Sequence, residues 1–189
     1  MSVMAIHYED IPIRDGGFTI ADLDEMPDDG RRYELVDGVL LVSPAPRWEH
    51  QRGGVTLSYV LEGACPDDLT VLLPVDVRRG DRTSVQPDLS VVRAEHLVRG
   101  EPFAAVPVLA VEILSPSSGG IDRLLKRDLY ARLGVPHYWI VDLAEPSVTV
   151  LDLHDDGSYR EQAVVRDQDL LDVDEPFTVT FRPADLLTT

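Results

Sequence analysis

The sequence has little cysteine, little basic charge and no long apolar run. Cys65 is the only cysteine among the 189 residues, which excludes an internal disulfide and a cysteine-based zinc cluster. The longest apolar stretch, VPVLAVEIL, is interrupted by Glu112 and is far shorter than the roughly 20 residues that cross a bilayer. Acidic residues near the N-terminus stand where a secretory signal has basic and apolar ones. We therefore expect a cytoplasmic protein that does not associate with membranes.

Basic side chains are scarce, and nearly all of them are arginine. The sequence has 17 Lys and Arg residues against 34 Asp and Glu residues, for a formal net charge of −17. Because such a surface repels phosphate backbones, contact with DNA must form at a local site rather than over a basic surface. Lys126 is the only lysine, and its compact ammonium has a more adjustable pKa than a guanidinium. This residue is therefore a candidate for chemistry.

The hydrophobic content of the sequence is sufficient for one hydrophobic core. Hydrophobic residues make up 44% of the chain, and a chain of this size buries roughly 70% of its unfolded surface. No repeat, low-complexity tract or long linker divides the sequence, so we expect a single domain over residues 1–189.

The apolar patterns alternate between strands and helices. Runs rich in β-branched residues predict strands at 31–38, 39–44, 69–79, 84–92, 106–116, 137–143, 147–153, 158–165 and 177–181. Helical spacing predicts helices at 20–27, 48–62 and 117–134. The pairs Asp37-Gly38 and Asp156-Gly157 are hairpin signals.

The helix expected at 117–134 lies between the strands expected at 106–116 and 137–143, and both strands are apolar enough to be buried on both faces. These two strands should therefore be parallel. The other connections favour antiparallel pairing. The predicted class is α/β (α+β), with a central mixed β-sheet flanked by helices and a C-terminal β-hairpin.

Glu112 is the most informative residue. It lies inside the apolar run at 106–116, where a carboxylate is costly unless a positive or donating group compensates it. A metal ion would do so. The alternative is a frayed strand end at which Glu112 reaches solvent or a buried arginine. Asp88 follows Pro87 at the start of LSVV and is either a second metal ligand or an ordinary turn residue.

Asp88 and Glu112 together suit a hard cation such as Mg²⁺, with Mn²⁺ as a substitute, because such ions take one or two carboxylates with waters and substrate phosphate. The backbone carbonyl of Ile113 would complete the set of protein ligands. Lys126 lies on the following helix and would reach back over the same end of the sheet. Its alternative is a solvated i,i+4 ion pair with Asp122.

These residues also resemble a known family. Asp88 in QPDLSVV, Glu112 in VEILSPSS and Lys126 in IDRLLKRDLYARLGVP precede HYWIVD, an order that resembles the Uma-type family of restriction endonucleases in the PD-(D/E)XK nuclease superfamily. Glu34 in YELVDGVLLVSPAP and His50 in WEHQR are similar to the N-terminal part of that family. The "PD" and "E-x-x" strings are common by themselves, and the order of all the pieces makes the match specific.

The resemblance covers about residues 18–153 and implies a fold and an activity. The fold is restriction-endonuclease-like, with the site at the fork of the central sheet. The implied activity is Mg²⁺-dependent hydrolysis of DNA phosphodiester bonds by an endonuclease.

The resemblance also implies residue roles. Asp88 and Glu112 would hold the metal, Glu34 would be an accessory acidic ligand or orienter, and Lys126 would position water and offset negative charge. Leu114 stands two residues after Glu112, where the superfamily pattern has its lysine. The resemblance implies that Lys126 has taken over that role from the helix.

Three hypotheses follow. The first is a Mg²⁺-dependent DNA endonuclease. The second is a nuclease-fold protein without useful turnover that acts as a binding or regulatory module. The third is a non-catalytic dimer in which Glu112 and Lys126 form a buried ion pair. A homodimer is also expected of the endonuclease, because two-fold symmetry suits the cutting of both strands. In this interpretation Tyr130 is a core residue, and His50 packs or lies at the surface.

Overall fold

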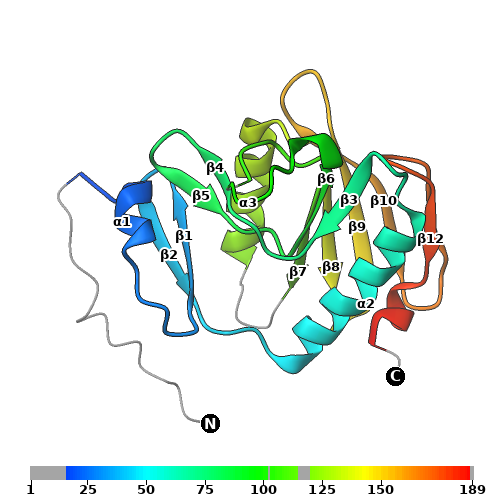
Figure 1. Ribbon diagram of the computed structural model, residues 1–189. Coiled ribbons are helices and arrows are strands. Elements are labelled where there is room, and N and C mark those ends of the chain that lie inside the picture. Colours follow the sequence, from blue (N-terminus) through cyan, green and yellow to red (C-terminus); the bar gives the residue numbers. More distant parts are fainter. Residues whose placement is uncertain (1–15, 102, 115–119, 188–189) are drawn as a thin grey trace, which may run out of the picture.

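The computed structural model describes residues 16–101, 103–114 and 120–187 (Figure 1). Its strands form a six-stranded sheet, a four-stranded sheet and a two-stranded ribbon. The SPSS segment that contributes to the family resemblance lies outside the described residues. Among the described residues, no helix is long and apolar enough to cross a membrane.

The six-stranded sheet has the order β10-β9-β8-β7-β6-β3. Its strands are β3 (Leu69–Leu72), β6 (Leu89–Arg93), β7 (Leu109–Leu114), β8 (His137–Asp142), β9 (Ser147–Leu153) and β10 (Tyr159–Arg166). β7 and β8 pair in parallel and all other neighbours are antiparallel, which confirms the mixed sheet and the interior position of β7. The hairpin predicted at Asp156-Gly157 joins β9 to β10.

Two helices cover opposite faces of this sheet. They are α2 (Trp48–Ala64), in front of the sheet in Figure 1, and α3 (Gly120–Leu133), behind it. Side chains alternate along β7: Leu109, Val111 and Ile113 pack in the cluster that contains the buried leucines of α2, whereas Ala110 packs in the cluster of α3. Glu112 therefore points to the α3 side.

α3 ends as its sequence predicts. Gly134 has a φ of 80°, a left-handed conformation that suits the residue after a helix, and Pro136 follows it. The chain then enters β8 directly, so α3 connects the two parallel strands.

The four-stranded sheet has the order β2-β1-β5-β4. Its strands are β1 (Arg32–Val36), β2 (Val39–Ser43), β4 (Val77–Arg79) and β5 (Thr83–Val85). Asp37 and Gly38 both have positive φ values, 50° and 84°, which is the conformation of a tight two-residue hairpin. The hairpin predicted from these two residues is thus confirmed.

The expectation of one continuous strand at 69–79 and another at 84–92 is wrong. Each run is broken into two strands that belong to different sheets: β3 and β4 come from the first, β5 and β6 from the second. The break in the first run contains Pro74, and the break in the second contains Pro87. Because proline has no N–H to donate to a ladder, the chain leaves one sheet at each of these points and enters the other. The two sheets diverge there and form a fork.

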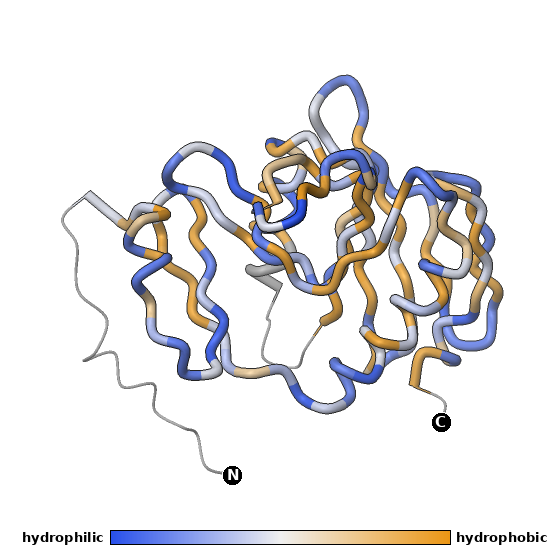
Figure 2. The backbone as a smooth tube through the Cα atoms, viewed as in Figure 1, coloured by the Kyte–Doolittle hydropathy of each residue, from blue (hydrophilic) through white to orange (hydrophobic). Residues whose placement is uncertain are grey.

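The remaining elements are short. They are α1 (Ile20–Asp24), the 3₁₀ turns η2 (Ala94–His96) and η3 (Pro183–Leu187), and the ribbon of β11 (Leu171–Val173) with β12 (Val179–Phe181). The sequence pattern predicted β12 but missed β11. Leu171, Phe181 and Leu186 from this C-terminal part join the core under α2. Figure 2 shows the hydrophobic backbone segments gathered in the strands and the hydrophilic ones in the connecting turns.

Candidate active site

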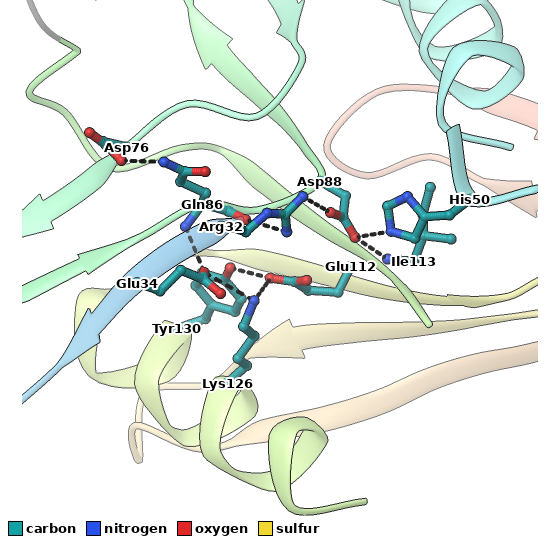
Figure 3. Close-up of polar contacts among 10 residues, drawn as sticks. All are labelled: Arg32, Glu34, His50, Asp76, Gln86, Asp88, Glu112, Ile113, Lys126 and Tyr130. Carbon is teal, nitrogen blue, oxygen red and sulfur yellow. Dashed lines mark hydrogen bonds and ion pairs between the residues drawn. The ribbon is translucent and has the colours of Figure 1, made fainter. Parts of the chain in front are cut away.

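The fork between the two sheets gathers the charged residues that the sequence singled out. Glu34 comes from β1, Asp88 immediately precedes β6, Glu112 is on β7 and Lys126 is on α3. All four side chains are buried. Figure 3 shows them converging from their separate elements.

Lys126 joins the two glutamates. Its Nζ donates to Oε1 of Glu112 at 2.9 Å and to Oε1 of Glu34 at 3.1 Å. The hydroxyl of Tyr130, one turn further along α3, donates to the same Oε1 of Glu112 at 2.6 Å. The backbone N–H of Gln86 donates to Oε1 of Glu34 at 2.9 Å. The lysine therefore points into the fork, and the alternative of a solvated surface residue is excluded.

Burial and neighbouring charges set the protonation of this group. Burial raises the pKa of Glu112 to about 7, with the charges of Asp88 and Glu34 adding to the effect and that of Lys126 opposing it. Burial alone would lower the pKa of Lys126, but the carboxylates of Glu112 and Glu34 outweigh it and raise the pKa above its ordinary value. Burial and the charge of Glu112 raise the pKa of Tyr130, so its hydroxyl remains a proton donor.

Asp88 has a separate set of partners. Arg32 Nη2 donates to Oδ1 at 2.8 Å, and His50 Nε2 lies 3.0 Å from Oδ2. The backbone N–H of Ile113 donates to Oδ2 at 2.8 Å. This last bond links the two groups, because Ile113 is the residue after Glu112.

The surroundings of Asp88 favour its ionised form. Burial opposes ionisation, but the hydrogen bond from His50 and the charge of Arg32 outweigh it and lower the pKa of Asp88. Burial likewise opposes the charge of Arg32, and Asp88 outweighs it, so the pKa of Arg32 is raised. Asp88 and Arg32 thus form an ion pair in which Asp88 is buried and Arg32 is half-buried.

Close packing of α2 positions His50 over Asp88. Gly53 follows His50 by about one turn, and a Cβ at Gly53 would lie 2.6 Å from Cδ1 of Leu143. Both Gly53 and Gly54 are buried. Gly53, which weakens the helix by its intrinsic preference, lets α2 approach Leu143 closely enough for His50 to reach the site.

Comparison with known proteins identifies the family. The family model Uma2, described as "Putative restriction endonuclease", matches residues 20–187. The chain belongs to the Uma2 family. The crystal structure of a putative nuclease belonging to DUF820 from Anabaena variabilis ATCC 29413 has the same fold, with a TM-score of 0.74 at 21% identity over 90% of this chain and 97% of that one. No curated protein matches the chain.

Membership confirms two predictions. The Uma2 chain has the nuclease-type fold that its motifs indicated, and the family is one of nucleases of the restriction-endonuclease type, which generally use divalent metals. The sheet fork holds Asp88, Glu112 and Lys126, the residues on which the resemblance depended.

The donor set of the Uma2 site fits a hard divalent cation. Glu112 supplies carboxylate oxygens from β7, and Asp88 supplies them from the position just before the neighbouring β6. In a strand the N–H and C=O of one residue point to the same side, so the carbonyl of Ile113 lies on the side of Asp88, to which its N–H donates. Burial raises the pKa of Glu112, and a cation would offset that cost. Within the described ranges, no three or more of the His, Cys, Asp and Glu side chains are grouped to hold a metal; Arg32 pairs with Asp88, and Lys126 pairs with Glu112.

Sequence reasoning missed Arg32 and ranked His50 and Tyr130 too low. Tyr130 is a core residue, as expected, but it also bonds Glu112. His50 contacts Asp88 rather than packing away from it. Arg32 and Glu34 are two residues apart on β1 and therefore share a face, a spacing that signals a charged pair directed into one site.

Proposed function

We propose that this Uma2 protein is a Mg²⁺-dependent endonuclease that hydrolyses phosphodiester bonds of DNA. The observation that supports this most strongly is the position of Lys126. With Leu114 in the place of the usual lysine, the catalytic interpretation requires that a lysine from elsewhere reach Glu112, and Lys126 does so at 2.9 Å.

Each residue of the fork has a role in this proposal. Asp88, Glu112 and the carbonyl of Ile113 are the metal ligands, and a bound divalent cation supplies charge stabilisation to the phosphate and a lowered pKa to water. Lys126 is the catalytic residue that donates to the attacking water and to the phosphate as negative charge develops. Glu34 and Tyr130 are positioning residues: Glu34 holds the ammonium of Lys126, and Tyr130 holds the carboxylate of Glu112.

Hydrolysis adds one water across the phosphodiester. The water oxygen forms a bond to phosphorus, the bridging P–O bond breaks, and a proton is transferred to the leaving oxygen. Lys126 is charged at neutral pH, because the pKa of its ammonium is raised, and so it acts through charge and hydrogen bonding.

The alternative is a nuclease-fold protein that binds without turnover. It shares the buried pair of Glu112 and Lys126, so the ion pair does not distinguish it from the enzyme. Binding of a metal in the fork favours both over a purely structural pair, and cleavage favours the enzyme. The homodimer expected from the resemblance stays a prediction.

The first test is calorimetric titration of Mn²⁺ into the metal-free protein and into Asp88→Ala, with Asp155→Ala as the control because Asp155 is an exposed aspartate of the β9–β10 turn. We expect the wild type and D155A to bind alike and D88A to bind at least about tenfold more weakly, since one of two carboxylates is lost. Equal binding by D88A would contradict the metal site.

The second test is cleavage of DNA with Mg²⁺ by wild type, Lys126→Met and Arg127→Met, purified in the same way. Arg127 is a cation on the same helix that donates to the carbonyl of Tyr159, outside the fork. We expect K126M to lose about 10²- to 10³-fold in rate and R127M to retain it. Cleavage by K126M at the wild-type rate would exclude Lys126 as the catalytic residue.

A further inference from the structure

α2 carries an unpaired apolar stripe on its outer side. Trp48, Val55 and Tyr59 are 68%, 53% and 82% exposed. Spacings of seven and four residues place all three within about 40° of one another around the helix. The opposite side of the same helix is fully packed, with Leu57 and Leu61 at 0% exposure. Two aromatic rings on the solvent side of a helix are a feature of a binding surface rather than of a core.

Charge around the stripe is opposite to that of the whole chain. Arg47 and Arg52 are exposed on either side of Trp48, in a protein of net charge −17. Of the two acidic residues of α2, Glu49 is half-buried, and the exposed Glu62 has its carboxylate turned toward β3, where it accepts from the N–H of Val71 at 2.8 Å. The stripe is therefore locally suited to a negatively charged partner.

The stripe begins beside the proposed active site. Trp48 is two residues from His50, which lies 3.0 Å from Asp88. The eleven residues from Trp48 to Tyr59 rise about 16 Å along the helix axis, which is the length of about five stacked bases at 3.4 Å each. A strand lying along the stripe would thus run toward the end of α2 that carries His50.

We infer that the outer face of α2, formed by Arg47, Trp48, Arg52, Val55 and Tyr59, is a stacking surface for unpaired bases, and that the substrate is single-stranded or locally unpaired DNA. Aromatic rings bind bases by their flat faces, which a duplex keeps within its own stack. Exposed arginines beside the rings contact the phosphates. A single strand also has a lower charge density than a duplex, so this acidic protein repels it less. The inference rests on the proposed nuclease function for the identity of the polymer.

The chain offers a direct probe of this contact. It has two tryptophans, and Trp139 is fully buried, so a change of tryptophan emission on ligand binding reports Trp48. An oligothymidylate of about twelve nucleotides is titrated in EDTA at low salt, where no metal-dependent cleavage occurs. A duplex of the same length is the comparison. We expect the single strand to quench the emission and to bind at least tenfold more tightly than the duplex.

Variants assign the binding to the stripe. One stacked base contributes about tenfold to affinity, so Trp48→Ala and Tyr59→Ala are each expected to bind the oligothymidylate about tenfold more weakly. Trp48→Phe keeps an aromatic face and is expected to restore most of the affinity. Leu170→Ala removes a half-exposed apolar side chain between β10 and β11 and is expected to change nothing.

Three results would overturn the inference. They are wild-type affinity in W48A, duplex binding as tight as single-strand binding, and a blue shift of Trp48 emission that grows with protein concentration without DNA. The last would show that a second copy of the chain covers the stripe. Glu112→Gln removes a proposed metal ligand, so it is expected to lose cleavage with Mg²⁺ and still bind the single strand in EDTA like the wild type. Quenching by the single strand in a wild-type protein that cleaves no DNA with Mg²⁺ would reject the proposed catalysis and leave the stacking surface standing.

Discussion

Of the two carboxylates proposed as metal ligands, Asp88 immediately precedes β6 and Glu112 lies on the adjacent β7, and yet their electrostatic surroundings are opposite. Asp88 has an arginine, a histidine and a backbone N–H as partners, and its pKa is lowered. Glu112 shares one lysine with Glu34, and its pKa is raised to about 7. Asp88 is therefore a fixed negative charge, whereas Glu112 carries a charge that its surroundings compensate incompletely. Pairs of acids whose pKa values are pushed apart are typical of catalytic sites.

The largest expected effect concerns the partner of Glu112. In Lys126→Met, Glu112 and Glu34 lose their buried cation, and breaking such a pair costs about 3–5 kcal/mol of the free energy of unfolding. Urea denaturation of the metal-free protein measures it. The double variant K126M with Glu112→Gln is expected to recover part of the loss, because the unpaired charge is removed. Simple addition of the two single effects would show that the residues are not coupled.

The two carboxylates should respond to pH in opposite directions. The folded pKa of Glu112 lies above its unfolded value of 4.5, so the folded state binds the extra proton between these values, and its stability falls as pH rises from about 4.5 to about 7. The pKa of Asp88 is lowered, so its contribution is present above about 4 and is lost as pH falls further.

Comparison with Glu112→Gln isolates the pH dependence of stability that comes from Glu112. Between pH 5 and pH 8 the metal-free wild type is expected to lose up to about 3 kcal/mol of unfolding free energy relative to E112Q, measured by urea denaturation in EDTA. Parallel pH profiles of the two proteins would show that the pKa of Glu112 is not raised by folding.

A smaller effect is expected on the Asp88 side. Arg32 occupies Oδ1 of Asp88, so it competes with a cation for the same carboxylate. Arg32→Ala is expected to bind Mn²⁺ about tenfold more tightly, as seen by calorimetry. Arg31→Ala is the matched control, because Arg31 pairs with Asp29 outside the site. Weaker binding in R32A would mean that Arg32 orders the site for the metal instead of competing with it.

Local sequence patterns were enough to predict the strands, the helix and the turn that carry the residues of the site. The Asp37-Gly38 hairpin, β7 and α3 follow from turn residues, apolar runs and helical spacing, each of which acts within a few residues. The order of Asp88, Glu112 and Lys126 indicated the family before any geometry was known. The strands expected at 69–79 and 84–92 were drawn through Pro74 and Pro87, although the chain passes from one sheet to the other at each of these prolines.

The partners within the site depend on distant segments. Arg32 contacts Asp88 although the two residues are 56 positions apart in the sequence, and His50 contacts Asp88 from 38 positions away. No local pattern predicts contacts between such distant positions. These contacts depend on how the two sheets diverge and on how closely α2 packs against the six-stranded sheet. The packing of Gly53 on Leu143 sets the second of these. Apolar spacing also did not separate the exposed side of α2 from its core side, because Val55 is exposed and Leu57 and Leu61 are buried although all three are apolar.

The single lysine gives the fork a built-in reporter of its opening. A protease that cuts only after lysine has one target bond in this chain, and that bond lies in the middle of α3 with its side chain held by two carboxylates. Cleavage there requires α3 to unwind locally, so its rate follows the population of molecules in which the helix has left the sheet. Any ligand that binds in the fork while α3 is packed on the sheet will slow cleavage after Lys126, whether or not the protein hydrolyses that ligand.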